Sequence, residues 1–204
     1  MIAVHESNEA LVDIREACPG VVLQIDPLRQ KNEKTMYARA TVASMLATAQ
    51  SYLPEGITFV LRDAWRPLSA QKMYFDSYYR RFQKEHPDWS ERELYRYTAN
   101  YAIPSDQPLR AGHMTGAAID LSLFRNGRRL AMSSKKLPFD KRAYTDSVQL
   151  SDYINRNRQL LKDVMERASF VNYPKEFWHY SYGDTMWAEL TNSKTAIYGP
   201  IEAL

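Results

Sequence analysis

Two short segments that lie far apart in the chain together supply two histidines and two carboxylates suited to a metal site. The first runs from His113 to Asp120 and the second from Glu176 to His179. The chain has only 4 histidines, and two of them occur here beside carboxylates. A catalytic zinc ion needs three ligands of the His, Asp or Glu kind, an open position and a nearby base. A fold that brings the two segments together is therefore suited to zinc-dependent hydrolysis.

The spacing inside each segment restricts the fold further. Asp120 lies seven positions after His113, and His179 lies three positions after Glu176, so both spacings are odd. In a flat strand, an odd separation places two side chains on opposite faces. If all four side chains face one site, neither segment is a continuous strand. We expect a break at Gly116, with a loop carrying His113 and a strand carrying Asp120, and Glu176 at the entrance of a strand.

Composition indicates one globular domain over residues 1–204. The formal net charge of +3 comes from 27 basic and 24 acidic residues, which is too weak to favour a nucleic-acid or membrane partner. Cys18 is the single cysteine, so neither an intrachain disulfide nor a thiolate-rich zinc site can form. The sequence has no apolar run suited to a signal peptide or a membrane span. We expect a cytoplasmic location, and the oligomeric state stays open.

The N-terminal half is predicted to contain helices around one buried strand. Residues 36–53 are rich in alanine and predict a helix that Pro54 ends. Residues 57–61 form a short apolar, β-branched run typical of a buried strand. A second helix is predicted over residues 69–85. The capping-box pattern that begins at Ser90 predicts a third, shorter helix.

The C-terminal half is predicted to complete a sheet. After a loop over residues 104–112, two strands flank Asn126-Gly127, a strong hairpin signal. The order of elements does not alternate regularly. This favours an α+β domain whose central, mainly antiparallel sheet carries the zinc site and is flanked by helices. The predicted elements are strands at residues 117–124 and 128–132, a helix at 147–168, and strands at 170–171 and 176–182.

The sequence resembles the zinc D-alanyl-D-alanine peptidases. The likeness lies in His113–Asp120 and in the Glu-Phe-Trp-His-Tyr run that begins at Glu176. The Asp-Ala-Trp-Arg-Pro run at residues 63–67 and the tail at residues 176–184 are similar to one branch, the D-Ala-D-Ala dipeptidases of the vancomycin-resistance type. The resemblance extends from about Val12 to Pro200.

The resemblance implies the roles of five residues. It implies one zinc ion per chain, a small α+β fold whose antiparallel sheet carries the metal, and a small peptide containing D-amino acids as substrate. Glu176 is implied as the catalytic base, and Arg66 as the group that stabilises the transition state. The implied zinc ligands are His113, Asp120 and His179.

The chain departs from the family pattern at two places. Ala111 stands where the family has a serine two residues before the first histidine. Residues 24–29 replace a block in which the family has a tyrosine. Both missing hydroxyls belong to the substrate-facing side in the family. We therefore expect weaker hydrolysis of D-Ala-D-Ala than is usual for the family, and a preference for a dipeptide with a different or larger side chain.

Simpler interpretations of single residues stay open. Arg66 can instead pair with Asp63, and Asp120 can serve as a cap or an ion-pair partner. Trp178 is interpreted as a packing residue that supports the metal site. The aromatic and basic stretch at residues 74–81 is better explained by a helix with one buried aromatic face than by a nucleic-acid surface. His5 and His86 are interpreted as surface or packed residues.

Two other functions compete with the dipeptidase. One is a D,D-carboxypeptidase or an endolysin-like cell-wall peptidase, which shares the metal chemistry. The other is a zinc-binding domain without turnover. Glu176 and Arg66 argue against the latter, because a structural zinc site needs neither a base nor a cation aimed at the substrate.

Overall fold

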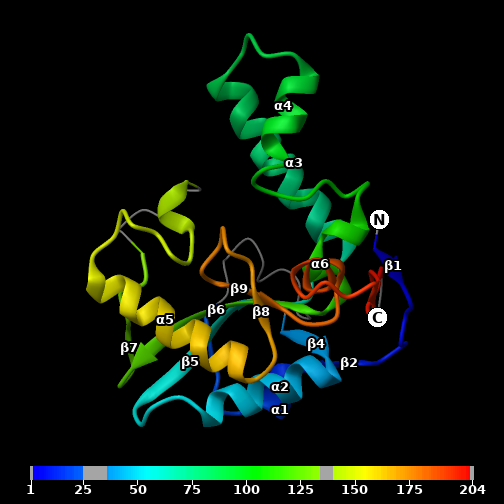
Figure 1. Ribbon diagram of the computed structural model, residues 1–204. Helices are drawn as coiled ribbons and strands as arrows, with labels where there is room; N and C mark the ends of the chain where they lie inside the picture. Colours follow the sequence, from blue (N-terminus) through cyan, green and yellow to red (C-terminus); the bar gives the residue numbers. More distant parts are fainter. Residues whose placement is uncertain (1, 25–35, 134–139, 203–204) are drawn as a thin grey trace.

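A central sheet with mainly antiparallel pairing runs through the molecule (Figure 1). The computed structural model describes residues 2–24, 36–133 and 140–202. Within them, the order of strands across the sheet is β3-β5-β6-β9-β8, and β7 pairs with the far end of β6. Among the described strands of this sheet, only β3 and β5 pair in parallel. The strands are β3 (Val22–Leu23), β5 (Ile57–Asp63), β6 (Ala118–Arg125), β7 (Arg128–Arg129), β8 (Val171–Asn172) and β9 (His179–Ser181).

Two helices cover one face of this sheet. They are α2 (Ala40–Ser51) and α5 (Asp152–Arg167), which contact each other. The apolar side chains of β6 at positions 119, 121 and 123 alternate toward these helices and are fully buried in the core. Because side chains alternate along a strand, Asp120 and Ser122 point to the opposite face. The hydrophobic core and the polar residues of β6 therefore lie on different sides of the sheet.

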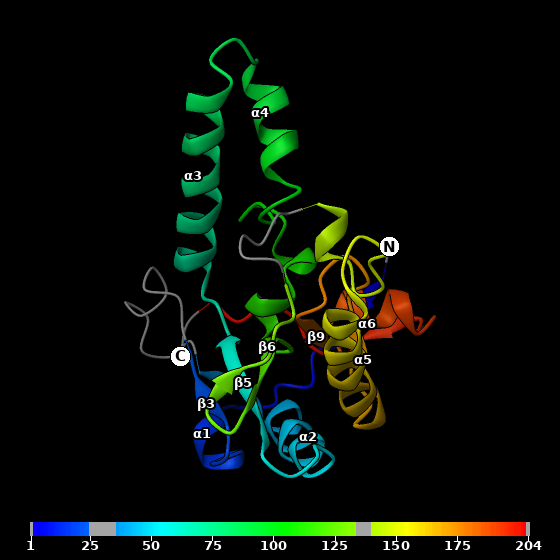
Figure 2. The same ribbon diagram turned by 90° about the vertical axis from the view of Figure 1, so that its left-hand side faces the viewer.

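A helical hairpin projects from this body (Figures 1 and 2). It consists of α3 (Leu68–Glu85) and α4 (Glu91–Thr98), joined by a short turn. The aromatic side chains of α3 pack against those on and just after α4, with the rings of Phe82 and Tyr101 4.6 Å apart. The expected helix with a packed aromatic face is confirmed. The Ser90 capping box also forms as predicted.

Shorter elements connect these parts. β1 pairs in parallel with β10, which places an N-terminal strand beside one near the C-terminus. β2 pairs antiparallel with β4. The remaining elements are β1 (Ala3–Val4), β2 (Leu11–Asp13), α1 (Ile14–Ala17), β4 (Tyr37–Arg39), α6 (Thr185–Leu190), β10 (Thr195–Ala196) and the 3₁₀ turns η1 (Pro108–Arg110), η2 (Gly112–Thr115) and η3 (Lys141–Ala143).

The predicted α+β class with a mainly antiparallel sheet is confirmed, but several element boundaries were wrong. The strand expected at residues 128–132 ends at Arg129. The helix expected from residue 36 begins at Ala40, because Tyr37–Arg39 instead pair with β2 as a strand. The helix expected from residue 147 begins at Asp152, where the Ser151 hydroxyl caps it. The strand expected from residue 176 begins only at His179.

Of the block at residues 24–29 that departs from the family pattern, residues 25–29 lie outside the described residues. Within the described ranges, the helices are too short or too polar to cross a lipid bilayer.

Candidate metal centre and active site

Three acidic and basic side chains form a row across the middle of the sheet. Asp120 on β6 pairs directly with His179 on β9. In the neighbouring strand β5, the residue directly opposite Asp120 is Asp63. A register shift after Leu61 brings Asp63 to this position. Directly opposite residues in neighbouring strands point to the same face. The row therefore points away from the helices that cover the hydrophobic core.

His113 reaches this face from a turn, not from a strand. It lies in η2, which ends at Gly116 in the left-handed conformation, with φ 69°. The break expected at Gly116 is thus present, and Asp120 lies in the strand that follows. The backbone amide of Arg66 donates to the carbonyl of His113 at 2.9 Å, which ties η2 to the segment after β5.

The ligand atoms of His113, Asp120 and His179 converge, all within 4.8 Å of one another. His113 Nε2 is 3.3 Å from Asp120 Oδ1, and His179 Nδ1 is 3.0 Å from the same oxygen. A tetrahedral zinc ion with bonds of about 2.0–2.1 Å separates its ligands by roughly 3.3 Å. The donor set and its spacing thus fit zinc. On the far side of the His113 ring, Nδ1 lies 2.8 Å from the Ala64 carbonyl, which leaves Nε2 as the lone-pair nitrogen.

Charge at this cluster favours a bound cation. Burial on its own raises the pKa of Asp120, but the charge of His113 and the hydrogen bonds from both histidines hold it well below its usual value. Burial lowers the pKa of His179, yet its hydrogen bond and attraction to Asp120 raise it overall. An ionised carboxylate between two imidazoles is the electrostatic setting that a metal ion completes.

Glu176 lies beside the cluster in a turn between β8 and β9. Its amide donates to Tyr173 O at 2.9 Å, and its carbonyl accepts from His179 N at 3.1 Å. Burial raises the pKa of the Glu176 carboxyl; His179 opposes the rise and the Asp120 charge adds to it. A carboxyl with a raised pKa near a cation site is suited to accepting and returning a proton.

Arg66 is held in place by three neighbours. Its guanidinium pairs with Asp63 Oδ2 and donates to Gln71 Oε1 at 2.7 Å. It also lies over the Tyr74 ring, 4.6 Å from the centroid. The pairing with Asp63 that the sequence left open is therefore present. Arg66 Nε is buried and has no acceptor among the described residues.

The other residues singled out from the sequence are Trp178, His86 and His5. Trp178 is buried and packs edge-on against Phe177, with ring centroids 4.9 Å apart, as expected of a packing residue. His86 stacks on Trp89 at the tip of the α3–α4 hairpin, and His5 is exposed near the N-terminus. Neither of these two histidines joins the metal-binding group.

Sequence reasoning missed the residues that hold the site together. Gln71 fixes Arg66 and also donates to Ile103 O at 2.5 Å. Asn172 donates to two backbone carbonyls in the Glu176 turn. Neither residue belongs to a motif, so the sequence carries no local signal for them.

Comparisons with known proteins agree with this site. The family model described as D-ala-D-ala dipeptidase matches residues 11–196. A D-alanyl-D-alanine dipeptidase of Synechocystis is 29% identical over 168 residues, which are 69% of this chain and 68% of that protein. One of Enterococcus faecalis is 28% identical over 153 residues, which are 70% and 71%.

The fold is also similar to a solved structure. The LD-carboxypeptidase LdcB aligns with a TM-score of 0.52 and 17% identity, over 94% of this chain and 76% of that chain. At that identity the likeness supports the fold alone. The family match covers most of the chain, and the family resemblance predicted from the sequence is confirmed. The chain therefore belongs to the D-Ala-D-Ala dipeptidase family of zinc metallopeptidases.

Proposed function

We propose that this enzyme hydrolyses a small dipeptide containing D-amino acids, with one zinc ion held by His113, Asp120 and His179. The observation that carries the proposal is the convergence of three ligand atoms within 4.8 Å on one face of the sheet, beside Glu176. The family match supports the same chemistry. A zinc-binding domain without turnover does not need the half-buried Glu176, whose carboxyl interacts electrostatically with His179 and Asp120.

The proposed chemistry divides between the metal and the protein. Zinc at this site supplies Lewis-acid chemistry, which polarises a peptide carbonyl and makes water acidic enough to attack near neutral pH. The Glu176 carboxylate accepts a proton from the attacking water and delivers it to the leaving amine. General acid–base catalysis of this kind contributes about 10²–10⁴-fold in rate.

Arg66 is proposed to stabilise the negative charge that develops on the carbonyl oxygen. A guanidinium is a planar cation with five N–H donors. Asp63, Gln71 and Tyr74 fix its orientation before substrate binds. Preorganised donors cost no reorganisation in the transition state, which makes such a group effective.

Replacing the base tests the assignment of roles. The variant Glu176→Gln keeps all three proposed ligands, so we expect about one zinc per chain and a loss of most of kcat, roughly 10²-fold or more. Metal analysis and steady-state kinetics on the same preparation measure both quantities. A Glu176→Gln protein that turns over at nearly the wild-type rate contradicts the assignment.

The substrate proposal depends on the hydroxyl groups that the chain lacks. A pocket closed around a free dipeptide has to pair an ammonium at one end and a carboxylate at the other, because unpaired buried charges cost affinity. Ala111 is buried two residues before His113 and has no polar side-chain atom. We therefore propose a dipeptide with a different or larger side chain as the preferred substrate, ahead of D-Ala-D-Ala.

A substrate panel separates this proposal from its alternatives. The panel consists of D-Ala-D-Ala, other D,D- and L,D-dipeptides and a tripeptide with a blocked amino terminus, compared by kcat/KM. We expect a dipeptide other than D-Ala-D-Ala to be hydrolysed best and the tripeptide poorly. A clear preference for D-Ala-D-Ala contradicts the substrate proposal alone, whereas a preferred tripeptide supports a carboxypeptidase. The one-domain organisation over residues 1–204 and the cytoplasmic location stay predictions from the sequence.

A further inference from the structure

The three-residue spacing between Glu176 and His179 is built from two consecutive tight turns. The first closes where the Glu176 amide donates to Tyr173 O at 2.9 Å, and the second where the His179 amide donates to Glu176 O at 3.1 Å. Tyr173 N donates back to His179 O at 3.0 Å. These turns bring the base and a metal ligand to one face, which a continuous strand cannot do at this spacing.

The side chain of Asn172 occupies the inside of this double turn. Its amide nitrogen donates to Glu176 O and to His179 O, each at 3.1 Å. The side chain is buried, and both acceptors are backbone atoms of residues proposed to act in catalysis. One amide group thus links the backbone of the base to the backbone of the ligand.

A second side chain fixes which way the Asn172 amide faces. The buried Thr145 hydroxyl donates to Asn172 Oδ1, which leaves the amide nitrogen toward the two carbonyls. Thr145 is itself attached to the turn, because its backbone amide donates to Pro174 O at 3.0 Å. Phe177 N donates to Ala143 O at 3.0 Å on the same segment. The segment around Thr145 therefore clamps the turn.

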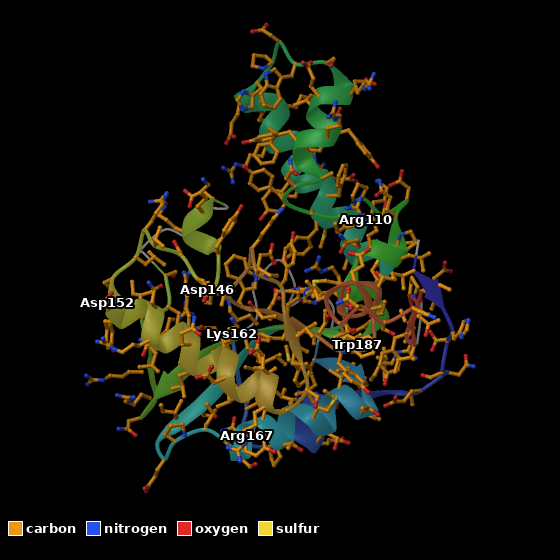
Figure 3. The ribbon with its side chains drawn as sticks, in the orientation of Figure 1. Arg110, Asp146, Asp152, Lys162, Arg167 and Trp187 are labelled. Atoms are coloured by element: carbon orange, nitrogen blue, oxygen red, sulfur yellow. The ribbon has the colours of Figure 1, made fainter. Side chains whose placement is uncertain are left out.

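Helix α5 holds this segment from the other side. Arg158 is fully buried and donates to three backbone carbonyls, including Tyr144 O at 2.6 Å and Arg142 O at 2.9 Å. Its guanidinium also lies 4.0 Å from the Phe177 ring centroid. Lys162 on α5 adds an outer ion pair to Asp146 at 3.6 Å, and Figure 3 shows both side chains on this side of the molecule.

We infer that Asn172 is a positioning residue: it closes the Glu176 turn from inside and fixes where the Glu176 carboxylate lies relative to the His179 ring. The Asn172 side chain contacts two backbone carbonyls and the Thr145 hydroxyl, not the metal-binding atoms. The inference rests on the proposed roles of Glu176 and His179. A misplaced base costs rate even when substrate and zinc still bind, because catalysis depends on near-attack geometry.

The variant Asn172→Asp tests this inference. It keeps the shape of the side chain but replaces the donor by an oxygen that faces two carbonyls. We expect kcat to fall by about 10–100-fold, the range found for residues that orient metal-site groups, with about one zinc per chain. KM should change by less than about threefold, because the side chain does not reach the substrate. A kcat that stays within about threefold of wild type overturns the inference.

Asn157→Asp is the matched control for a general loss of stability. Asn157 is as buried as Asn172, 7% exposed in both cases, and donates to one backbone carbonyl, Ala131 O, at 2.8 Å. It lies on α5, outside the turn. We expect Asn157→Asp to lower the melting temperature about as much as Asn172→Asp while leaving kcat near wild type. Equal losses of kcat in the two variants show a merely structural role and overturn the inference.

Thr145 provides a second variant should Asn172→Asp fold poorly. Thr145→Val removes the hydroxyl at nearly constant shape, whereas Thr145→Ser keeps it. We expect Thr145→Val to lower kcat and Thr145→Ser to restore it. In the zinc-loaded protein, hydrogen exchange of the Asn172 side-chain amide should be slow in wild type and faster in Thr145→Val. Identical exchange and identical kcat in the two Thr145 variants contradict the inference.

A double-mutant cycle separates this inference from the proposed function. If Asn172 acts through Glu176, Asn172→Asp adds little further loss in a Glu176→Gln background. Fully additive losses overturn the inference. A Glu176→Gln protein that keeps its rate overturns the proposed base, and the inference with it. A Glu176→Gln protein that loses its rate beside an Asn172→Asp protein that keeps it overturns the inference alone.

Discussion

Among the single residues, Arg66 is the one for which the sequence left two alternative roles: an ion pair with Asp63 and a role in catalysis. The structure makes them compatible. Asp63 and Gln71 each accept a hydrogen bond from the guanidinium, and the Tyr74 ring packs against its flat face. These contacts orient a planar cation, and a guanidinium has more N–H groups than the two contacts use.

A lysine at position 66 separates charge from geometry. Arg66→Lys keeps the positive charge but loses the planar fork that meets Asp63 and Gln71 together. We expect kcat to fall by about 10²-fold at unchanged zinc content, with a smaller change in KM. Steady-state kinetics on the zinc-loaded variant measure both. A loss confined to KM makes Arg66 an anchor for the substrate carboxylate. Arg110, which lies in η1 and is labelled in Figure 3, is then the next residue to test.

At the scale of elements, the turn that carries His113 depends on one glycine. Gly116 has φ 69°, and a Cβ there lies 2.3 Å from Leu11 Cδ2. Gly127 in the hairpin has a similar φ of 76°, but a Cβ there meets nothing within 4 Å. An alanine at either position has the strain of a left-handed backbone. Only at Gly116 does it also clash with Leu11, and only Gly116 lies in the turn that carries the proposed ligand His113.

Paired alanine variants use this difference. Gly127→Ala should lower the free energy of unfolding by about 1–2 kcal/mol and leave zinc affinity unchanged. Gly116→Ala should lower it further and weaken zinc binding, because the clash with Leu11 adds to the backbone strain in the turn that carries His113. Urea unfolding and competition with a zinc chelator provide the two measurements. Equal unfolding losses with wild-type zinc affinity in both variants refute the proposed link.

The elements that the sequence predicted well depend on local signals. The Ser90 capping box and the Asn126-Gly127 turn are encoded by adjacent residues, and both residues of that turn adopt the positive φ that the hairpin requires. Residues 37–39 were misassigned because their partner strand, Leu11–Asp13, is distant in sequence. Asn172 escaped for the same reason: its role depends on a turn closed by tertiary contacts. The roles of the five site residues stay predictions.

At the scale of the whole molecule, a buried arginine connects segments near both ends of the described chain to the proposed metal site. Arg39 donates to Thr115 O in η2 at 2.8 Å, to Glu9 O at 2.6 Å and to Gly199 O at 3.1 Å. Its guanidinium also pairs with Glu6 at 3.1 Å. The N-terminal segment, the C-terminal segment and the turn that carries His113 are therefore held by one side chain.

Zinc titration into metal-stripped protein is the most direct test of the proposal that one zinc ion per chain drives hydrolysis. Hydrolysis of the best dipeptide on the panel is followed as zinc is added to wild type and to His179→Ala. Wild-type activity should start near zero, rise in proportion to bound zinc and level off at one ion per chain. His179→Ala, left with two of the proposed ligands, should recover no activity at the same zinc concentrations. Turnover by the metal-free protein contradicts zinc-dependent hydrolysis, and full recovery by His179→Ala contradicts the assignment of His179 as a ligand.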